Sequence, residues 1–216
     1  MSKYLSAAFL AAFVLLFSTT SEAVTVNKVD FRTSAFSSAN GKSSYSWMTD
    51  GVKITVRALN GKLSWDDEDG FGIKGVGYEN DEVEGQERIS FSFLEDVKLS
   101  TVSLSDLFYE DGYFEKGSYQ LTRQSNTSVN HAFSARDSSS AGNQRISINA
   151  VVSSIIFQAP GIVGKQDHEF SISALTFSLY SCPPTPGPTV PEPASILLLG
   201  GALLGGAVRR KLALRA

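Results

Sequence analysis

The residues best suited to chemistry lie in one acidic stretch, "WDDEDGFGIKGVGYENDEVEGQERISFSF", which runs from Trp65 to Phe93. Its carboxylates fall in loops that flank a glycine-spaced strand. Calcium prefers a shell of carboxylate and backbone carbonyl oxygens, and loops of this composition offer both. The stretch therefore predicts candidate calcium ligands, which are Asp67, Asp69, Asp81 and Glu84. The alternative interpretation is a pair of solvated, mutually repulsive loops that keeps strand edges from aggregating.

The same acids offer only a weak basis for catalysis. Glycosidases need two carboxylates several ångströms apart across a cleft, and acids clustered in surface loops meet that requirement by chance. A serine–histidine–acid triad would lack the nucleophile-elbow pattern G-x-S-x-G, which this sequence does not contain. His131 and His168 are interpreted as ordinary strand or turn residues. We expect a protein that is not an enzyme and has no cofactor other than the candidate calcium.

Several aromatic residues near expected turns offer a binding surface instead. Exposed rings can stack on the faces of sugars, whereas large aromatic side chains also dominate the interiors of folded domains. Both interpretations stay open for the residues concerned, which are Trp47, Trp65, Tyr78, Tyr109 and Tyr113.

Strands must position these groups, because apolar and polar residues alternate with period two from Val24 to Tyr180. The stretches "VKITVRAL" and "RISFSF" show the alternation clearly, and turn signals such as "NGK", "DEDG" and "EDGY" separate the runs. The stretch "QRISINAVVSSIIFQ" begins with alternation and becomes more continuously apolar, as expected of a strand buried on both faces in its later part. About nine or ten such strands predict an all-β fold, an antiparallel β-sandwich with the jelly roll as the favoured arrangement.

The charge of the expected domain argues against one class of partner. The chain has 19 basic and 22 acidic residues, of which 14 basic and 20 acidic residues lie between Val24 and Val190. The resulting charge of −6, without a basic stripe in the sequence, argues against nucleic acid, since phosphate binding relies on clustered lysine and arginine. The charge is compatible with cation binding, with neutral or basic ligands, or with solubility alone.

Residues 1–23 are predicted to be a signal peptide. Lys3 supplies the positive n-region, and residues 7–17 supply the apolar h-region. Signal peptidase is expected to cleave between Ala23 and Val24, which exports the chain. An uncleaved anchor is the alternative, although the apolar run is shorter than the roughly 20 residues of a comfortable membrane span.

The expected domain, 24–180, is followed by a proline-rich linker at 181–190, where prolines favour a stiff extended spacer. The only cysteine, Cys182, lies in this linker, so no intramolecular disulfide can form. The apolar segment 194–208 would form a transmembrane helix about 22 Å long at a rise of ~1.5 Å per residue. Such a helix is short for a hydrocarbon core of roughly 30 Å. The basic residues that follow would hold the C-terminus in the cytoplasm while the domain lies outside.

Three parts of the tail, 191–216, occur in a fixed order: Pro191-Glu192-Pro193, a Gly- and Leu-rich segment, and Arg209-Arg210. In this combination the tail resembles the PEP-CTERM sorting signal of bacterial proteins associated with exopolysaccharide. The resemblance implies that an exosortase recognises the Pro-Glu-Pro triplet, with the arginines as the retention signal. It also implies removal of the helix and delivery of the domain to the cell surface or extracellular matrix. A permanent anchor is the alternative, and the resemblance says little about the preceding domain.

These expectations combine into one predicted function. We expect an exported, non-enzymatic β-sandwich protein that is anchored transiently in the inner membrane, sorted by an exosortase and associated with exopolysaccharide. A secreted polysaccharide-active enzyme and a self-associating structural or adhesive protein are the alternatives. No nucleic acid partner is expected.

Overall fold

The computed structural model describes residues 25–75, 81–110, 112–123, 127–139, 141–160 and 168–180. All of them belong to the first of two compact units, Met1–Tyr180 and Ser181–Ala216. The expected signal peptide with its Ala23–Val24 junction, the linker and the sorting tail lie outside the described residues, as does the apolar segment 194–208. Within the ranges described, no helix is long and apolar enough to cross a membrane.

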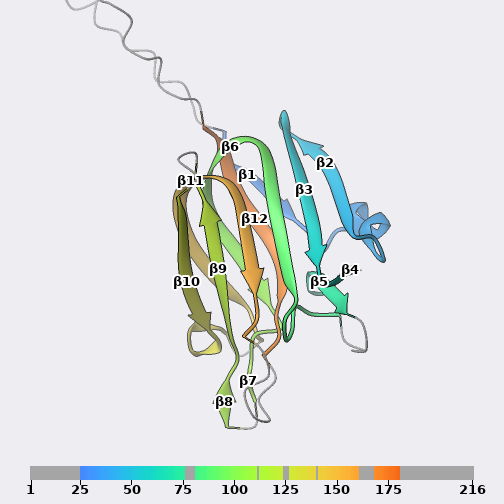
Figure 1. Ribbon diagram of the computed structural model, residues 1–216, viewed down its shortest axis with the longest axis vertical. Coiled ribbons are helices and arrows are strands. Elements are labelled where there is room, and N and C mark those ends of the chain that lie inside the picture. Colours follow the sequence, from blue (N-terminus) through green and yellow to red (C-terminus); the bar gives the residue numbers. More distant parts are fainter. Residues whose placement is uncertain are drawn as a thin grey trace, which may run out of the picture. The chain divides into compact units, whose positions relative to one another are not determined.

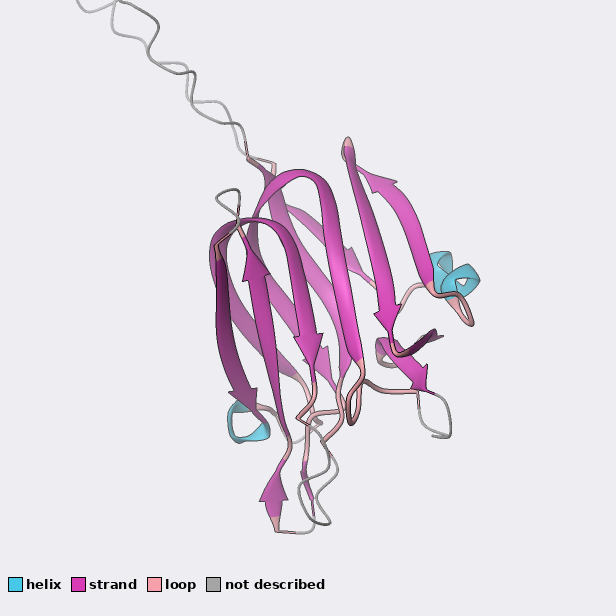
Figure 2. Ribbon diagram, viewed as in Figure 1, coloured by secondary structure: helices cyan, strands magenta, loops and turns pink. Residues whose placement is uncertain are grey.

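Strands make up most of the described chain, with two short 3₁₀ helices between them (Figure 2). The strands are β1 (Asn27–Asp30), β2 (Ser44–Thr49), β3 (Val52–Leu59), β4 (Gly61–Asp66), β5 (Gly70–Gly75), β6 (Arg88–Ser105), β7 (Tyr109–Glu110), β8 (Tyr113–Phe114), β9 (Lys116–Thr122), β10 (Ser128–Ser134), β11 (Gln144–Gln158) and β12 (Ser171–Leu179). The 3₁₀ helices are η1 (Ser34–Ala39) and η2 (Ala135–Asp137). The predicted all-β fold is confirmed.

Ten of the strands form one antiparallel sheet that folds back on itself into a β-sandwich. Figure 1 shows the first layer in front, with β10, β9, β11, β6, β3 and β2 side by side. The second layer is built around β12, which pairs with β1, β5 and β6. The predicted antiparallel β-sandwich is therefore confirmed.

Two strands, β6 and β11, belong to both layers because each curves over one end of the sandwich (Figure 1). Residues 88–93 of β6 pair with β3 in the first layer, and residues 97–105 pair with β12 in the second. At the corner, residues 93–96 of β6 lie opposite the single residue Ser153 of β11. Extra residues on one strand bend a pair of strands, and such bends let strands pass from one layer to the next.

The apolar run in β11 comes from a change in which positions face the core, not from burial of both faces of the strand. Val152 faces the core before the corner, whereas Ile155 and Phe157 face it afterwards. The inward set therefore changes from even to odd positions at the register shift between Val152 and Ser154. The prediction that the apolar half is buried on both faces is wrong, since outward-facing residues there, such as Ile156, are only half-buried.

Phenylalanine side chains fill the space between the layers. Phe31, which follows β1, is fully buried, and its ring centroid lies 5.0 Å from that of Phe71 and 5.3 Å from that of Phe91. A second group includes Phe133 and Phe170, whose rings meet edge to face at 5.0 Å. Aromatic pairs in these arrangements add to the burial energy, so this core holds both layers in place.

Candidate functional site

Alternation along the six strands of the first layer leaves one set of side chains on its outer surface, while their neighbours point into the core. We name this surface the polar face. It consists of Ser44, Ser46 and Met48 of β2, Lys53, Thr55, Arg57 and Leu59 of β3, Arg88, Ser90 and Ser92 of β6, Ser154, Ile156 and Gln158 of β11, Lys116, Ser118, Gln120 and Thr122 of β9, and Ser128, Asn130, Ala132 and Ser134 of β10. Hydroxyl and amide side chains dominate this set, and it contains no carboxylate.

Strand pairing aligns the polar face into rows that run across the layer. One row contains only hydroxyl residues, in the order Ser128, Thr122, Ser154, Ser92, Thr55 and Ser46. The side-chain oxygens of Ser46 and Thr55 lie 2.8 Å apart and share a hydrogen bond. With ~4.8 Å between neighbouring strands, a row across the layer is about 24 Å long. The polar face is thus broad enough to contact an extended polymer.

The polar face is hollowed over β6, β11, β9 and β10. The hollow has a volume of about 310 Å³ and is lined by Arg88, Ser118, Tyr119, Gln120, Asn130, Ile156 and Gln158. The three amide side chains each carry both donors and an acceptor. Ile156, which lies opposite Gln120 in the sheet register, supplies an apolar surface beside it. An apolar surface with a few placed polar groups is typical of ligand sites in proteins.

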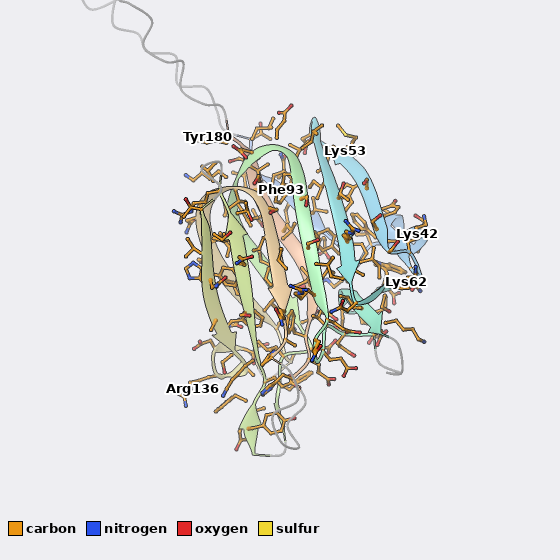
Figure 3. The ribbon with its side chains drawn as sticks, in the orientation of Figure 1. Lys42, Lys53, Lys62, Phe93, Arg136 and Tyr180 are labelled. Atoms are coloured by element: carbon orange, nitrogen blue, oxygen red, sulfur yellow. The ribbon has the colours of Figure 1, made fainter. Side chains whose placement is uncertain are left out.

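Positive charge collects on the polar face although the expected domain is acidic. Its charged side chains are Lys53, Arg57, Arg88 and Lys116, all of them exposed. The ion pairs among the described residues are made by Asp30, and none involves these four bases. Figure 3 shows Lys53 near the end of β3 that lies beside the bend of β6, close to Phe93. The absence of carboxylates leaves this face with a positive local potential.

Of the aromatic residues named as candidate sugar-stacking residues, the four that the structure describes do not belong to the polar face. Trp47 lies edge-on to two core phenylalanines, with ring centroids at 5.1 and 5.7 Å, and Trp65 donates its Nε1–H to a backbone carbonyl at 2.6 Å. Tyr109 is 59% exposed but belongs to the small β7–β8 hairpin. Tyr113 is half-buried in the same hairpin, and Tyr78 lies outside the described residues.

An acidic cluster forms where the β4–β5 turn meets the end of β6. Asp69 and Asp106 share a side-chain hydrogen bond. Burial, together with the charge of Asp69, raises the pKa of Asp106 to about 7. Burial also raises the pKa of Asp69 and that of Glu82, with Asp81 adding repulsion to both. These carboxyl groups therefore hold protons more tightly in the folded protein than in water.

Two of the four predicted calcium ligands, Asp69 and Asp81, lie in this cluster. Asp67 is exposed in the β4–β5 turn, and Glu84 is buried beside Glu87, whose pKa burial raises to about 7. The sequence does not predict that Asp106 belongs to this cluster, because Asp106 follows β6 and is remote from Asp69 along the chain. Among the described residues, no group of three or more His, Cys, Asp or Glu side chains is placed to hold a metal ion. The calcium site stays a prediction.

The remaining candidates are a second hollow and the two histidines. The second hollow, of about 710 Å³, is lined by Asn40, Gly41, Asn60, Gly61, Lys62, Leu63, Lys74 and Gly75. Its lysines, Lys62 and Lys74, are direct partners in the β4–β5 register, where like charges repel each other.

His131 stacks on Tyr119 with centroids 4.9 Å apart, and His168 lies edge-on to a tyrosine at 5.5 Å. Both histidines have the aromatic packing of ordinary structural residues.

Comparison with solved structures finds a distant likeness to carbohydrate-binding modules. The family 32 module of NanJ from C. perfringens, in complex with galactose, gives a TM-score of 0.34 at 10% identity and covers 59% of this chain and 93% of that chain. The CBM32-2 module of GH31, bound to GalNAc, gives 0.33 at 9% identity, with 74% and 100% covered. The low-affinity xylan-binding module CBM86 from Roseburia intestinalis gives 0.31 at 9% identity, with 72% and 96% covered.

The sequence comparisons concern the tail rather than the β-sandwich. A comparison with curated protein sequences gives no match. Residues 189–211 match the family model of the PEP-CTERM protein-sorting motif. The match includes the Pro-Glu-Pro triplet at 191–193 and the arginines at 209 and 210, on which the resemblance rests. The chain therefore carries a PEP-CTERM protein-sorting motif, which implies export and sorting by an exosortase.

Proposed function

We propose that this chain is an exosortase-sorted surface protein whose β-sandwich binds extracellular polysaccharide through the polar face. The observation that carries the proposal is a broad outer surface of hydroxyl and amide side chains with a hollow at one end. Polysaccharides present rows of hydroxyl groups, which pair with side chains that both donate and accept hydrogen bonds. The sorting motif supports the proposal because it directs the domain to the cell surface, where such polymers occur.

Binding without catalysis is the function that fits this surface. Glycoside hydrolysis uses a pair of carboxyl groups on either side of the scissile bond. The polar face contains no carboxylate, and the acidic cluster is built from a different turn and the end of β6. A polymer bound on the polar face would therefore meet hydrogen-bonding groups and cations but no acid–base pair.

Affinity electrophoresis of the purified full chain in mild detergent, in gels that contain single polysaccharides, tests the proposal. We expect retardation by at least one polysaccharide. The double variant Gln120→Ala/Gln158→Ala should weaken this binding at least about tenfold, because each lost hydrogen bond is worth ~1 kcal/mol.

The matched control is Ser103→Ala/Thr176→Ala, which removes polar groups from the outer side of the second layer. This variant should migrate like the parent chain. Retardation by no polysaccharide in a panel of neutral and acidic polymers would overturn the proposal. Equal losses in the two double variants would place the binding site elsewhere on the molecule and would also overturn it.

A further inference from the structure

We propose that the polymer bound at the polar face is an acidic polysaccharide, which Arg57 and Arg88 recognise through its carboxylate or sulfate groups. This inference rests on the proposed function and adds the chemical class of the ligand. The structural observation is a pair of arginines on neighbouring strands, in a hydrogen-bonding surface that has no carboxylate to neutralise them.

The sheet register brings the two arginines close together. Arg57 of β3 lies opposite Ser90 of β6, and Arg88 is two residues before Ser90 on the same strand. Their side chains therefore emerge on the same side as diagonal neighbours, whose backbones are about 7–8 Å apart in a sheet. Arg88 also lines the hollow. A ligand that enters the hollow from β9 thus reaches one arginine and then the other.

Both arginines are unpaired among the described residues, unlike the arginine at the start of the domain. Arg32 makes two hydrogen bonds to the carboxylate of Asp30, at 2.9 and 2.8 Å. Arg57 and Arg88 are exposed and have no carboxylate of a described residue within 4.0 Å. A guanidinium group presents a planar fork of donors that fits carboxylate and sulfate oxygens in pairs. The guanidinium groups of Arg57 and Arg88 are therefore both available to an anionic ligand.

The charge distribution of the β-sandwich favours an acidic polymer at the polar face. The region from Val24 to Val190 carries 20 acidic and 14 basic residues, whereas the polar face carries bases and no acid. On the polar face, Lys53 and Lys116 extend the positive charge beyond the two arginines. Because these cations are spread over β3, β6 and β9, they match charges repeated along a chain better than one small anion.

The test compares one polyuronate, such as alginate, with the same polymer after chemical reduction of its carboxyl groups to alcohols. We expect the full chain to bind the polyuronate at least about tenfold more tightly than the reduced polymer, with a difference that shrinks as salt rises. Dextran sulfate is the second arm and separates sulfate from carboxylate as the recognised group.

The decisive variant is Arg57→Gln/Arg88→Gln, in which the preference for the acidic polymer should be lost. The matched control, Lys98→Gln/Arg145→Gln, removes the same charge from exposed positions on the second-layer halves of β6 and β11. The control should keep the preference. Arg57→Lys/Arg88→Lys keeps the positive charge but removes the planar guanidinium donors, so this variant should retain part of the preference for the acidic polymer. Unchanged melting temperatures will show that all variants fold.

Three outcomes would overturn the inference. Equal binding to the polyuronate and its reduced form, without binding of dextran sulfate, would overturn it while leaving the proposed function intact. Equal losses in the arginine variant and the control would show that net charge, rather than the polar face, governs binding. Failure to bind any polymer would remove the proposed function as well, so the two failures are distinguishable.

Discussion

At the scale of single residues, Asp69 shares a hydrogen bond with Asp106 and is repelled by the charge of Asp81. The concentration of acids around Asp69 and Asp81 is visible in the chain, and the structure does bring these two residues together. Their partner Asp106 is invisible to spacing arguments because it lies after β6 and enters the cluster only through folding. The arginines of the polar face are hidden in the same way, since Arg57 and Arg88 come from different strands.

The Asp69–Asp106 pair makes the stability of the fold depend on pH. The pKa of Asp106 is raised from 3.8 to about 7, so the folded state binds this proton more tightly than the unfolded state does. Stability should therefore fall as pH rises between about 4 and 7, and the full penalty should be present above pH 7. We expect a higher melting temperature at about pH 5.5 than at about pH 8, with EDTA present in both samples.

Replacement of Asp106 by Asn should raise the melting temperature at about pH 8 and reduce this pH dependence, of which Glu87 supplies a further part. Asn removes the titrating charge and tolerates the positive φ of 54° at this position. The matched control is Asp67→Asn, an exposed carboxylate of the same turn, which should change neither quantity. A pH profile whose slope in Asp106→Asn is as steep as in the parent chain would contradict the assignment of a penalty to this group.

The calcium prediction is tested in the same melting experiment. A cation that binds only the folded state stabilises it, and it would compete with protons for the same carboxylates. We expect added calcium to raise the melting temperature at about pH 8 and to have less effect at about pH 5.5. A melting temperature that calcium and EDTA leave unchanged would refute a site at Asp67, Asp69, Asp81 and Glu84.

At the scale of strands, the sequence predicts their presence better than their extent. The alternation in "RISFSF" and "VKLSTVSL" marks two strands, but both belong to β6, which bends between them. Period-two patterning reports which side chains face the core, and β6 keeps its apolar side chains inward in both layers. A bend that joins two layers therefore leaves little trace in the pattern, whereas in β11 it appears as a change of phase at Ser153.

The contact between β5 and the segment that follows it depends on a glycine. A Cβ on Gly72 would overlap the backbone carbonyl of Asp81 and come within 2.8 Å of the Cα of Glu82. Because backbone atoms cannot rotate away, we expect Gly72→Ala to lower the free energy of unfolding by about 3 kcal/mol. Urea denaturation measures this change.

Gly41→Ala is the comparison for this substitution. Gly41 has a φ of +74° and no atom within 4 Å of the added Cβ, so only backbone strain should be felt there. Such strain costs about 1 kcal/mol. If both variants lose the same stability, the close approach of β5 to Asp81 does not constrain the fold.

At the scale of the whole molecule, the sorting motif and the polar face differ in how local their sequence signals are. The sorting motif is a short contiguous stretch, so residues 189–211 reveal it without any knowledge of the fold. The all-β class is likewise predicted from local sequence, namely from the alternation of apolar and polar residues along each strand. The polar face is assembled from six strands scattered between Ser44 and Gln158, and the acidic total of the chain conceals its positive charge. Composition averages over surfaces, whereas binding depends on which surface carries each charge.

The sorting motif makes a prediction about the mature protein that is independent of its ligand. If an exosortase processes the chain, mass spectrometry of protein recovered from the cell surface should show that residues beyond the Pro-Glu-Pro region are missing. Replacement of Pro191, Glu192 and Pro193 by alanine should leave the chain uncut in the membrane fraction. Recovery of surface protein that ends at Ala216 would contradict processing.

Because Met1–Tyr180 is a compact unit by itself, the trimmed protein should melt at the same temperature as the uncut chain.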